Sequence, residues 1–271
     1  MSKPPQYGVV AMLDVLGGRT SGFDDTERLI GNLNNFLESE DLKKNWTRLY
    51  NLSSENTNLR VVQDTIIFDM EQKKRADESF SDPLLIACNA MFLLAATEWL
   101  MSAMVVGLKC GLPLRGAVAI GHYSLAQFTT NYGQMSAILG PAVSDAASWY
   151  EKADWLGLIA TPACAHTISY FSEWLKEGRE SPQGARFKDL RWSVDDKFVE
   201  YPVPLVDGTA EKLWALSWPD QWPSRRSFLS ALVGLPVPFG TQRKYSNTLN
   251  FFDWYIKNKR PKAAAADPGV G

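Results

Sequence analysis

The chain has 271 residues, 45% of them hydrophobic, and its 28 basic residues nearly balance 30 acidic ones. The net charge of −2 provides no positive field along which DNA or RNA could bind, so extended nucleic acid is not an expected partner. Three scattered cysteines and two separate histidines predict neither a disulfide framework nor a zinc site. They favour the reduced thiols of a cytoplasmic protein.

The first predicted strand covers residues 7–14 and ends at an acidic residue. Its apolar run, Tyr-Gly-Val-Val-Ala-Met-Leu, is typical of a central strand covered on both faces. Asp14 follows where such a strand would leave the core, and a Gly-Gly-Arg segment comes shortly after it. A helix is predicted next, because Asp24–Thr26 resembles a helix start and apolar residues follow at helical spacing.

A second acidic residue lies in another apolar run. Residues 46–52 and 58–69 are rich in β-formers, and the second of these predicted strands carries Asp64. If the strands of Asp14 and Asp64 pair, their carboxylates make a hard-oxygen site suited to Mg²⁺ or Mn²⁺. Two metals about 3.5–4 Å apart can align a nucleophilic oxygen with a phosphate leaving group, the chemistry of phosphoryl or nucleotidyl transfer. A lone aspartate, by contrast, more often ends a strand at a turn.

Residues 83–110 are strongly apolar and predict a long helix packed on the sheet. Polar residues such as Asn89, Glu98 and Lys109 interrupt the run, so it does not reach the roughly 18 residues that a membrane span requires. We therefore expect a soluble chain with no membrane contact. A buried strand over 114–121, a hairpin partner over about 122–130 and a helix over about 142–153 are predicted next.

The second half of the chain is rich in tryptophan. It predicts a strand and a helix over 155–174, two or three strands over 192–218, and helices over 224–259. The tryptophans are interpreted as core or subunit-interface residues rather than ligand contacts. We expect one α/β domain: a core over 1–165, an elaboration packed on it over 166–259, and a disordered tail over 260–271.

The order of the predicted elements, β–helix–β–β–helix–β–β–helix, resembles that of the class III nucleotidyl cyclases over about residues 7–163, and four segments carry the resemblance. They are Leu13–Gly17, Arg60–Asp64, Leu114–Gly121 and Gly140–Glu151. The resemblance implies an α/β (α+β) fold of the ferredoxin-like palm type, with an antiparallel sheet, helices on one face and a catalytic core over 1–165. It also implies a homodimer whose two antiparallel subunits complete composite active sites.

The resemblance assigns metal and phosphate roles to the first strand end and its neighbours. Asp14 and Asp64 would bind two Mn²⁺ or Mg²⁺ ions per active site, and the carbonyl of Val15 would complete one coordination shell. Phosphate contacts would come from the backbone N–H groups of Leu16, Gly17 and Gly18, and from the side chain of Arg115.

The positions of the family's transition-state asparagine and arginine hold Ser144 and Ser148 here. Arginines in analogous transfer roles are worth factors of about 10³–10⁵. Either another cation substitutes, Lys152 and Arg19 being the nearest in sequence, or the chain is an inactive relative that binds nucleotide without turnover.

The base-recognition positions hold Arg60 and Ala137, so the carboxylate that would accept from an adenine amino group is missing. This combination resembles the pyrimidine cyclases of bacterial antiphage (Pycsar) systems, as do the Val-Ser-Asp-Ala helix and the Trp/Phe-rich C-terminal segment. Members make cyclic CMP or cyclic UMP, which activates a separate effector protein. Arg60 offers only donors and so favours uracil, while Tyr50 is a second candidate base contact that could supply an acceptor.

These observations predict a uridylate cyclase that converts UTP to 3′,5′-cyclic UMP and pyrophosphate in antiphage defence. A cytidylate cyclase acting on CTP is the first alternative. A nucleotidyltransferase that joins two nucleotides and a catalytically dead binding module are the others, and Mg²⁺ and Mn²⁺ suit the site equally.

Overall fold

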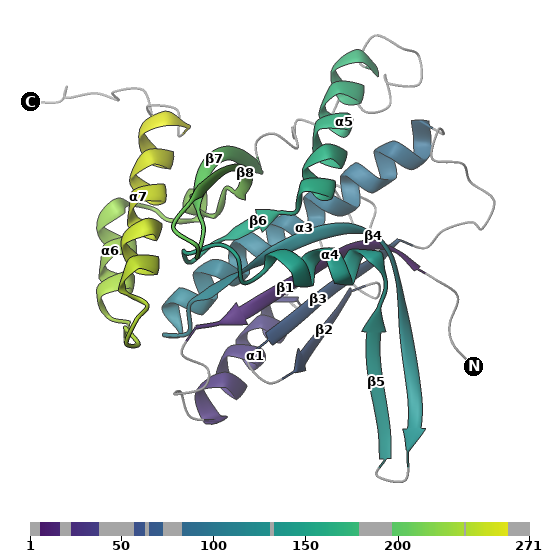
Figure 1. Ribbon diagram of the computed structural model, residues 1–271, viewed down its shortest axis with the longest axis horizontal. Helices are drawn as coiled ribbons and strands as arrows, with labels where there is room; N and C mark the ends of the chain where they lie inside the picture. The colour runs from purple at the N-terminus through teal and green to yellow at the C-terminus, as the bar shows by residue number, and fades with distance from the viewer. Residues whose placement is uncertain are drawn as a thin grey trace, which may run out of the picture.

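An eight-stranded sheet organises the computed structural model, which describes residues 6–16, 23–37, 57–62, 65–72, 83–130, 133–178, 197–235 and 237–259 (Figure 1). The strands are β1 (Gln6–Val15), β2 (Thr57–Val62), β3 (Thr65–Gln72), β4 (Leu114–Thr130), β5 (Gly133–Leu139), β6 (Leu158–Ala160), β7 (Phe198–Pro204) and β8 (Ala210–Leu216). Their order is β2-β3-β1-β4-β6-β8-β7, with β5 paired to β4. Every pairing is antiparallel except that of β4 with β6. The predicted mixed fold with a mostly antiparallel sheet is confirmed.

The helices lie on both faces of this sheet. They are α1 (Phe23–Leu37), α3 (Pro83–Lys109), α4 (Pro141–Trp149), α5 (Pro162–Gly178), α6 (Arg225–Val233) and α7 (Gln242–Asn258), with a 3₁₀ turn η4 (Trp218–Gln221). The main core packs α1 and α3 against one face, whereas α4 packs against the other. Helices were expected on one face only. The α4 helix approaches the second face closely because its buried residues there, Ala142 and Ala146, are small.

The central strand β1 is buried on both sides, as predicted from its continuous apolar run. Val9, Ala11 and Leu13 belong to the main core, whereas Val10 belongs to the smaller cluster under α4. Because side chains alternate along a strand, Asp14 points to the same face as Val10. The first predicted site residue therefore lies on the face that α4 covers.

The predicted strand over 58–69 is wrong, because this segment forms two strands. The strands β2 and β3 pair antiparallel, with Val62 opposite Thr65. Only Gln63 and Asp64 join them, and both lie outside the described residues, as does the strand predicted over 46–52. Gln63 and Asp64 interrupt the apolar pattern for only two residues, and single polar residues also alternate along strands, so the pattern did not reveal the hairpin.

The hairpin predicted for residues 114–130 is also placed wrongly. Residues 122–130 continue β4 instead of forming its partner, and the partner is β5. The pairing runs from Ser124 opposite Leu139 to Thr130 opposite Gly133. The outer half of β4 and β5 projects from the rest of the sheet as a two-stranded arm (Figure 1). The first strand of this hairpin was predicted to end at Gly121, but this residue lies inside β4, opposite Gly8 of β1.

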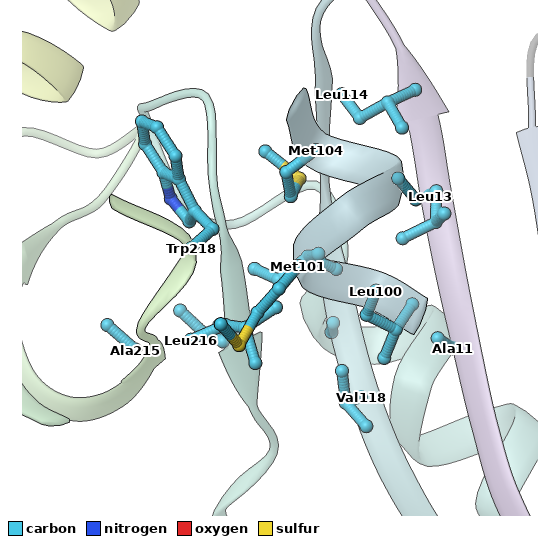
Figure 2. Close-up of a cluster of buried hydrophobic side chains, with 14 of the residues drawn as sticks. Ala11, Leu13, Leu100, Met101, Met104, Leu114, Val118, Ala215, Leu216 and Trp218 are labelled. Carbon is cyan, nitrogen blue, oxygen red and sulfur yellow. The ribbon is translucent and has the colours of Figure 1, made fainter. Parts of the chain in front are cut away.

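The long apolar helix α3 forms the centre of the core. Figure 2 shows Met101 and Met104 between Leu13 of β1 on one side and Leu216 and Trp218 on the other. Among the described residues, Phe92–Lys109 is the one helical segment long and apolar enough to cross a membrane by length and composition. Of that window, 78% is buried inside the fold, so packing against the sheet accounts for its apolar character.

The C-terminal helices pack through aromatic rings. Trp155 stacks on Tyr201 at 5.6 Å between ring centroids and meets Phe251 edge-on at 4.5 Å. Phe228 of α6 stacks on Phe252 of α7 at 4.1 Å. Trp155, like Trp218 of η4, is fully buried, which confirms the interpretation of these tryptophans as core residues.

Ser224 caps α6, and its replacement gives a small, clean test of local stability. Its side chain accepts from the N–H of Ser227, while the Ser227 side chain accepts from the N–H of Ser224. Ser224→Ala should therefore lower the free energy of unfolding by about 1 kcal/mol, measured by urea denaturation. Ser230→Ala, on the exposed face of the same helix, is the control and should not destabilise the protein. Equal losses in the two variants would contradict the capping role.

Candidate functional site

A hydrogen-bonded ion pair lies at the end of β1. The strand register places Asp14 opposite Arg115 of β4 on one side and opposite Thr65 of β3 on the other. The Nε of Arg115 donates to Oδ2 of Asp14 at 2.7 Å, and the side chains are 11% and 12% exposed. Two residues 101 positions apart in the sequence are thus brought together at one nearly buried point.

Arg115 is held from a second direction by main-chain carbonyl groups. Its Nη1 donates to the carbonyl oxygen of Glu151 at 3.0 Å and to that of Ala153 at 3.5 Å. Both carbonyls belong to residues 151–157, which connect α4 to β6 and are called the connecting segment below. The guanidinium is therefore fixed between the carboxylate of Asp14 and this segment.

Tyr150 was not predicted as a site residue, but it lies beside Asp14. Burial raises its pKa, as do the charge and hydrogen bond of Glu151 and the charge of Asp14, whereas a hydrogen bond with Thr65 opposes the shift. The hydroxyl therefore stays protonated at neutral pH. The sequence signal was its position at the end of the Gly140–Glu151 segment, next to an acidic residue.

A second buried ion pair lies on β2 and β3. Arg60 forms a salt bridge with Asp69, whose side chain is 0% exposed, and the hydroxyl of Tyr123 donates to Oδ2 of Asp69 at 3.2 Å. Burial lowers the pKa of the Arg60 guanidinium from its ordinary value. Neither Asp69 nor Tyr123 was predicted, although a charge within an apolar strand must find a partner when buried.

The two ion pairs share one face of the sheet. Arg60 pairs with Ile67, which pairs with Met12, and Met12 lies two residues before Asp14 on the same side of β1. Two strand spacings of about 4.8 Å and two residues of about 3.4 Å put the Cα atoms of Arg60 and Asp14 roughly 12 Å apart. Cationic groups thus lie at both ends of a strip across this face, which α4 borders.

The predicted phosphate loop is only partly described. Val15 is buried at the end of β1, and the N–H of Leu16 donates to the carbonyl oxygen of Pro113 at 2.9 Å. The phosphate contact of the Leu16 N–H stays a prediction, and a phosphate oxygen would have to replace the Pro113 carbonyl as its acceptor. Gly17 and Gly18 lie outside the described residues.

Three further predicted residues also lie outside the described part of the chain: Arg19, Tyr50 and Asp64.

The positions that differ from the cyclase pattern contain no charge that faces Asp14 directly. The hydroxyl of Ser148 donates to the carbonyl oxygen of Ser144 at 2.7 Å, so it is used within α4. The Nζ of Lys152 lies 4.1 Å from the centre of the Trp149 ring, a cation–π contact, and the side chain is exposed. Lys152 therefore already has an aromatic partner in this structure.

The candidate metal ligands that the structure describes at this end of β1 are oxygen atoms. The carboxylate of Asp14 and the carbonyl of Val15 suit a hard divalent cation. No group of three or more His, Cys, Asp or Glu residues that could hold a metal occurs within the described ranges. The donor chemistry thus fits Mg²⁺ or Mn²⁺, but a two-metal site needs a second carboxylate, for which Asp64 is the candidate.

No protein-family model and no curated protein matches the chain. Solved structures similar to it include the guanylyl cyclase domain of the RhoGC fusion protein from the aquatic fungus Blastocladiella emersonii. The two are 12% identical with a TM-score of 0.42, and the match covers 79% of this chain and 98% of that one. The adenylyl cyclase CyaB from P. aeruginosa has 12% identity and a TM-score of 0.38, over 83% and 98%. The guanylyl cyclase Cya2 has 11% identity and a TM-score of 0.33, over 89% and 98%. At such identities, what this chain does has to be inferred from its own residues.

Proposed function

We propose that this chain is a nucleotidyl cyclase that converts UTP to 3′,5′-cyclic UMP and pyrophosphate. The observation that carries the proposal is the Asp14–Arg115 pair at a strand end, on the same sheet face as Arg60. This arrangement offers a carboxylate for a metal, a cation for phosphate and a separate donor group for a base. The Cα atoms of Arg60 and Asp14 are roughly 12 Å apart. An extended nucleoside triphosphate is comparable in length, so its base and its phosphates could lie at the two residues.

In this proposal Asp14, the carbonyl of Val15 and Asp64 would hold two divalent ions, Mn²⁺ or Mg²⁺. Asp64 directly precedes Thr65, the residue that pairs with Asp14, which supports its assignment to the same site. When bound, such ions lower the pKa of the ribose 3′-hydroxyl and offset negative charge on the phosphates. The 3′-oxygen attacks the α-phosphorus in line, the bond to the bridging oxygen breaks, and pyrophosphate leaves.

The chain's own groups bind and orient the substrate. Arg115 would hold the triphosphate, with the N–H groups of Gly17 and Gly18 as further phosphate donors. Arg60 would donate to a uracil carbonyl oxygen, and Asp69 would fix its guanidinium in place. Tyr50 is retained as a second base contact. No carboxylate stands at Ala137 to accept from an adenine amino group.

The wider proposal follows the resemblance to pyrimidine cyclases of antiphage systems. Residues 1–165 would form the catalytic core and residues 166–259 an elaboration. Two copies would form a homodimer with composite sites in the cytoplasm. The cyclic nucleotide would act as a second messenger on a separate effector protein.

Four parallel incubations test this function. The purified protein is given ATP, GTP, CTP or UTP with Mn²⁺ or Mg²⁺, and the products are identified by mass. We expect cyclic UMP from UTP, at about tenfold or more the rate of any product from CTP, because a hydrogen bond to a charged donor is worth about 1.5–3 kcal/mol.

Other outcomes separate the alternatives. Cyclic CMP as the main product would assign the CTP specificity, and linear dinucleotides would indicate a nucleotidyltransferase. Nucleotide binding without any product would indicate the dead binding module. That last reading is favoured by the Ser148 hydroxyl being bound within α4 and by Lys152 lying on Trp149.

A further inference from the structure

The C-terminal helix α7 is attached to the segment that holds Arg115. We propose, on the premise of the function above, that α7 positions the phosphate-binding arginine through Asp154, and that Asp154 and Lys244 are positioning residues for catalysis. Neither residue is in contact with Asp14 or Arg115 through any hydrogen bond described above. Their effect on Arg115 passes through the main chain of the connecting segment.

Asp154 is the point of attachment between the connecting segment and α7. Its side chain is 6% exposed, Lys244 Nζ donates to its Oδ1 at 2.9 Å, and Arg243 Nε donates to its Oδ2. Asn247 Nδ2 donates to the main-chain oxygen of Asp154 at 2.7 Å. Lys244 is itself 11% exposed, so removal of either charge leaves the other buried and less well paired.

A second hydrogen bond of α7 holds the same segment. The N–H of Leu156 donates to the hydroxyl of Thr248 at 2.7 Å, and Thr248 is fully buried. Residues 243, 244, 247 and 248 recur at the spacing of one helical face. One face of α7 therefore binds the connecting segment at both Asp154 and Leu156.

The other side of the same segment binds the arginine. The carbonyl groups of Glu151 and Ala153 accept from Arg115 Nη1, and Ala153 is adjacent to Asp154 in the chain. The N–H of Gly116, the residue after Arg115, donates to the carbonyl of Gly157 at 2.9 Å. A shift of the main chain at Asp154 would thus move the acceptors that orient the guanidinium.

The carboxylate of Asp154 stays ionised, and so paired with Lys244 and Arg243, around neutral pH. Burial tends to raise the pKa of Asp154, but the hydrogen bonds and charges of Lys244 and Arg243 outweigh it, so the pKa lies below its ordinary value. A carboxyl with a lowered folded-state pKa contributes stability that is present above the unfolded pKa of about 3.9 and lost as pH falls through the folded value. Titration of Asp154 therefore does not release α7 near pH 7.

The test compares nucleotides with and without the terminal phosphates. 3′-Deoxy-UTP cannot cyclise, because it lacks the attacking hydroxyl, and 3′-deoxy-UMP lacks the phosphates that Arg115 would hold. In titration calorimetry, Asp154→Asn should weaken 3′-deoxy-UTP binding about tenfold, the loss of one charged hydrogen bond. Binding of 3′-deoxy-UMP should change less than about twofold on the same reasoning. Asp154→Glu, which keeps the carboxylate, should recover part of the loss.

Two further variants control the experiment. Asp253→Asn also breaks an ion pair of α7, with Arg225 at 2.6 Å, but that pair is about half exposed and joins α7 to α6, so it should change neither affinity. Asn247→Ala removes a bond to the segment without unpairing a buried charge, and it replaces Asp154→Asn if that variant does not fold.

Equal weakening of both nucleotides, or no weakening of either in a folded variant, would overturn the positioning role. If the wild-type protein makes cyclic UMP and Asp154→Asn binds 3′-deoxy-UTP as tightly as the wild type, this inference alone is refuted. Wild-type protein that binds neither nucleotide and makes no product would refute the proposed function, and this inference with it.

Discussion

Asp14→Asn is expected to lower the rate of cyclic nucleotide formation by about 10³-fold or more. Asparagine has nearly the same shape, and its side-chain oxygen can still accept from Arg115 Nε, as Oδ2 of Asp14 does at 2.7 Å. It lacks the negative charge that makes a carboxylate a stronger ligand for a divalent cation than a neutral amide oxygen. The variant thus separates the metal role of Asp14 from its role as the partner of Arg115. Initial rates with UTP measure the effect, and light scattering should give an unchanged oligomeric state.

Glu200→Gln is the matched control for this experiment. Glu200 lies on β7 in an ion pair with Lys212 at 2.6 Å, and the two side chains are 49% and 68% exposed. Exposed pairs of this kind contribute at most about 1 kcal/mol, so rate and stability should stay near those of the wild type. A rate for Asp14→Asn within tenfold of the wild-type rate would refute the assignment of Asp14 as a metal ligand.

Arg60→Met should produce two separable losses. The first is structural: Asp69 is 0% exposed, so loss of the Arg60 cation weakens the pairing of a buried charge and lowers the free energy of unfolding by about 3–5 kcal/mol. The second is functional: the ratio of kcat/KM for UTP to that for CTP should fall about tenfold or more, since a charged donor to uracil is lost. Urea denaturation measures the first loss and steady-state kinetics the second.

The double variant Arg60→Met/Asp69→Asn distinguishes the two effects. It removes both charges, and the asparagine oxygen can still accept from the hydroxyl of Tyr123. Stability should recover in part, because no buried charge remains, while the preference for UTP should stay low. If the double variant regains the wild-type preference along with its stability, Arg60 supports the fold and does not read the base.

Patterns that extend over many neighbouring residues could be predicted from the sequence. The continuous apolar run of β1 and the length of α3 fixed a buried strand and a core helix, and the position of Asp14 at the end of β1 followed. Turns within apolar stretches could not be placed in this way. The hairpin between β2 and β3 has a two-residue link, and β4 continues past Gly121, where the predicted strand had ended.

Partnerships between distant residues were also beyond the sequence pattern. Arg60 had been interpreted as a donor to the base with no protein partner named, and in the structure it pairs with Asp69. Asp154 and Lys244 are 90 positions apart, and nothing in their surroundings indicates that they meet. Such pairs depend on the order of strands in the sheet and on the placement of α7, both of which are properties of the whole fold.

The distance in sequence between Asp154 and Lys244 also bears on the order of events during biosynthesis. Lys244 is added 90 residues after Asp154. At about 5–20 residues per second, a ribosome needs roughly 5–20 s to make that stretch. Until then the nascent chain already contains Asp14 and Arg115 but not the helix that completes the hold on Arg115. If α7 positions Arg115 as proposed, a truncated product that stops before α7 would fold without a fully oriented arginine and should make little cyclic nucleotide.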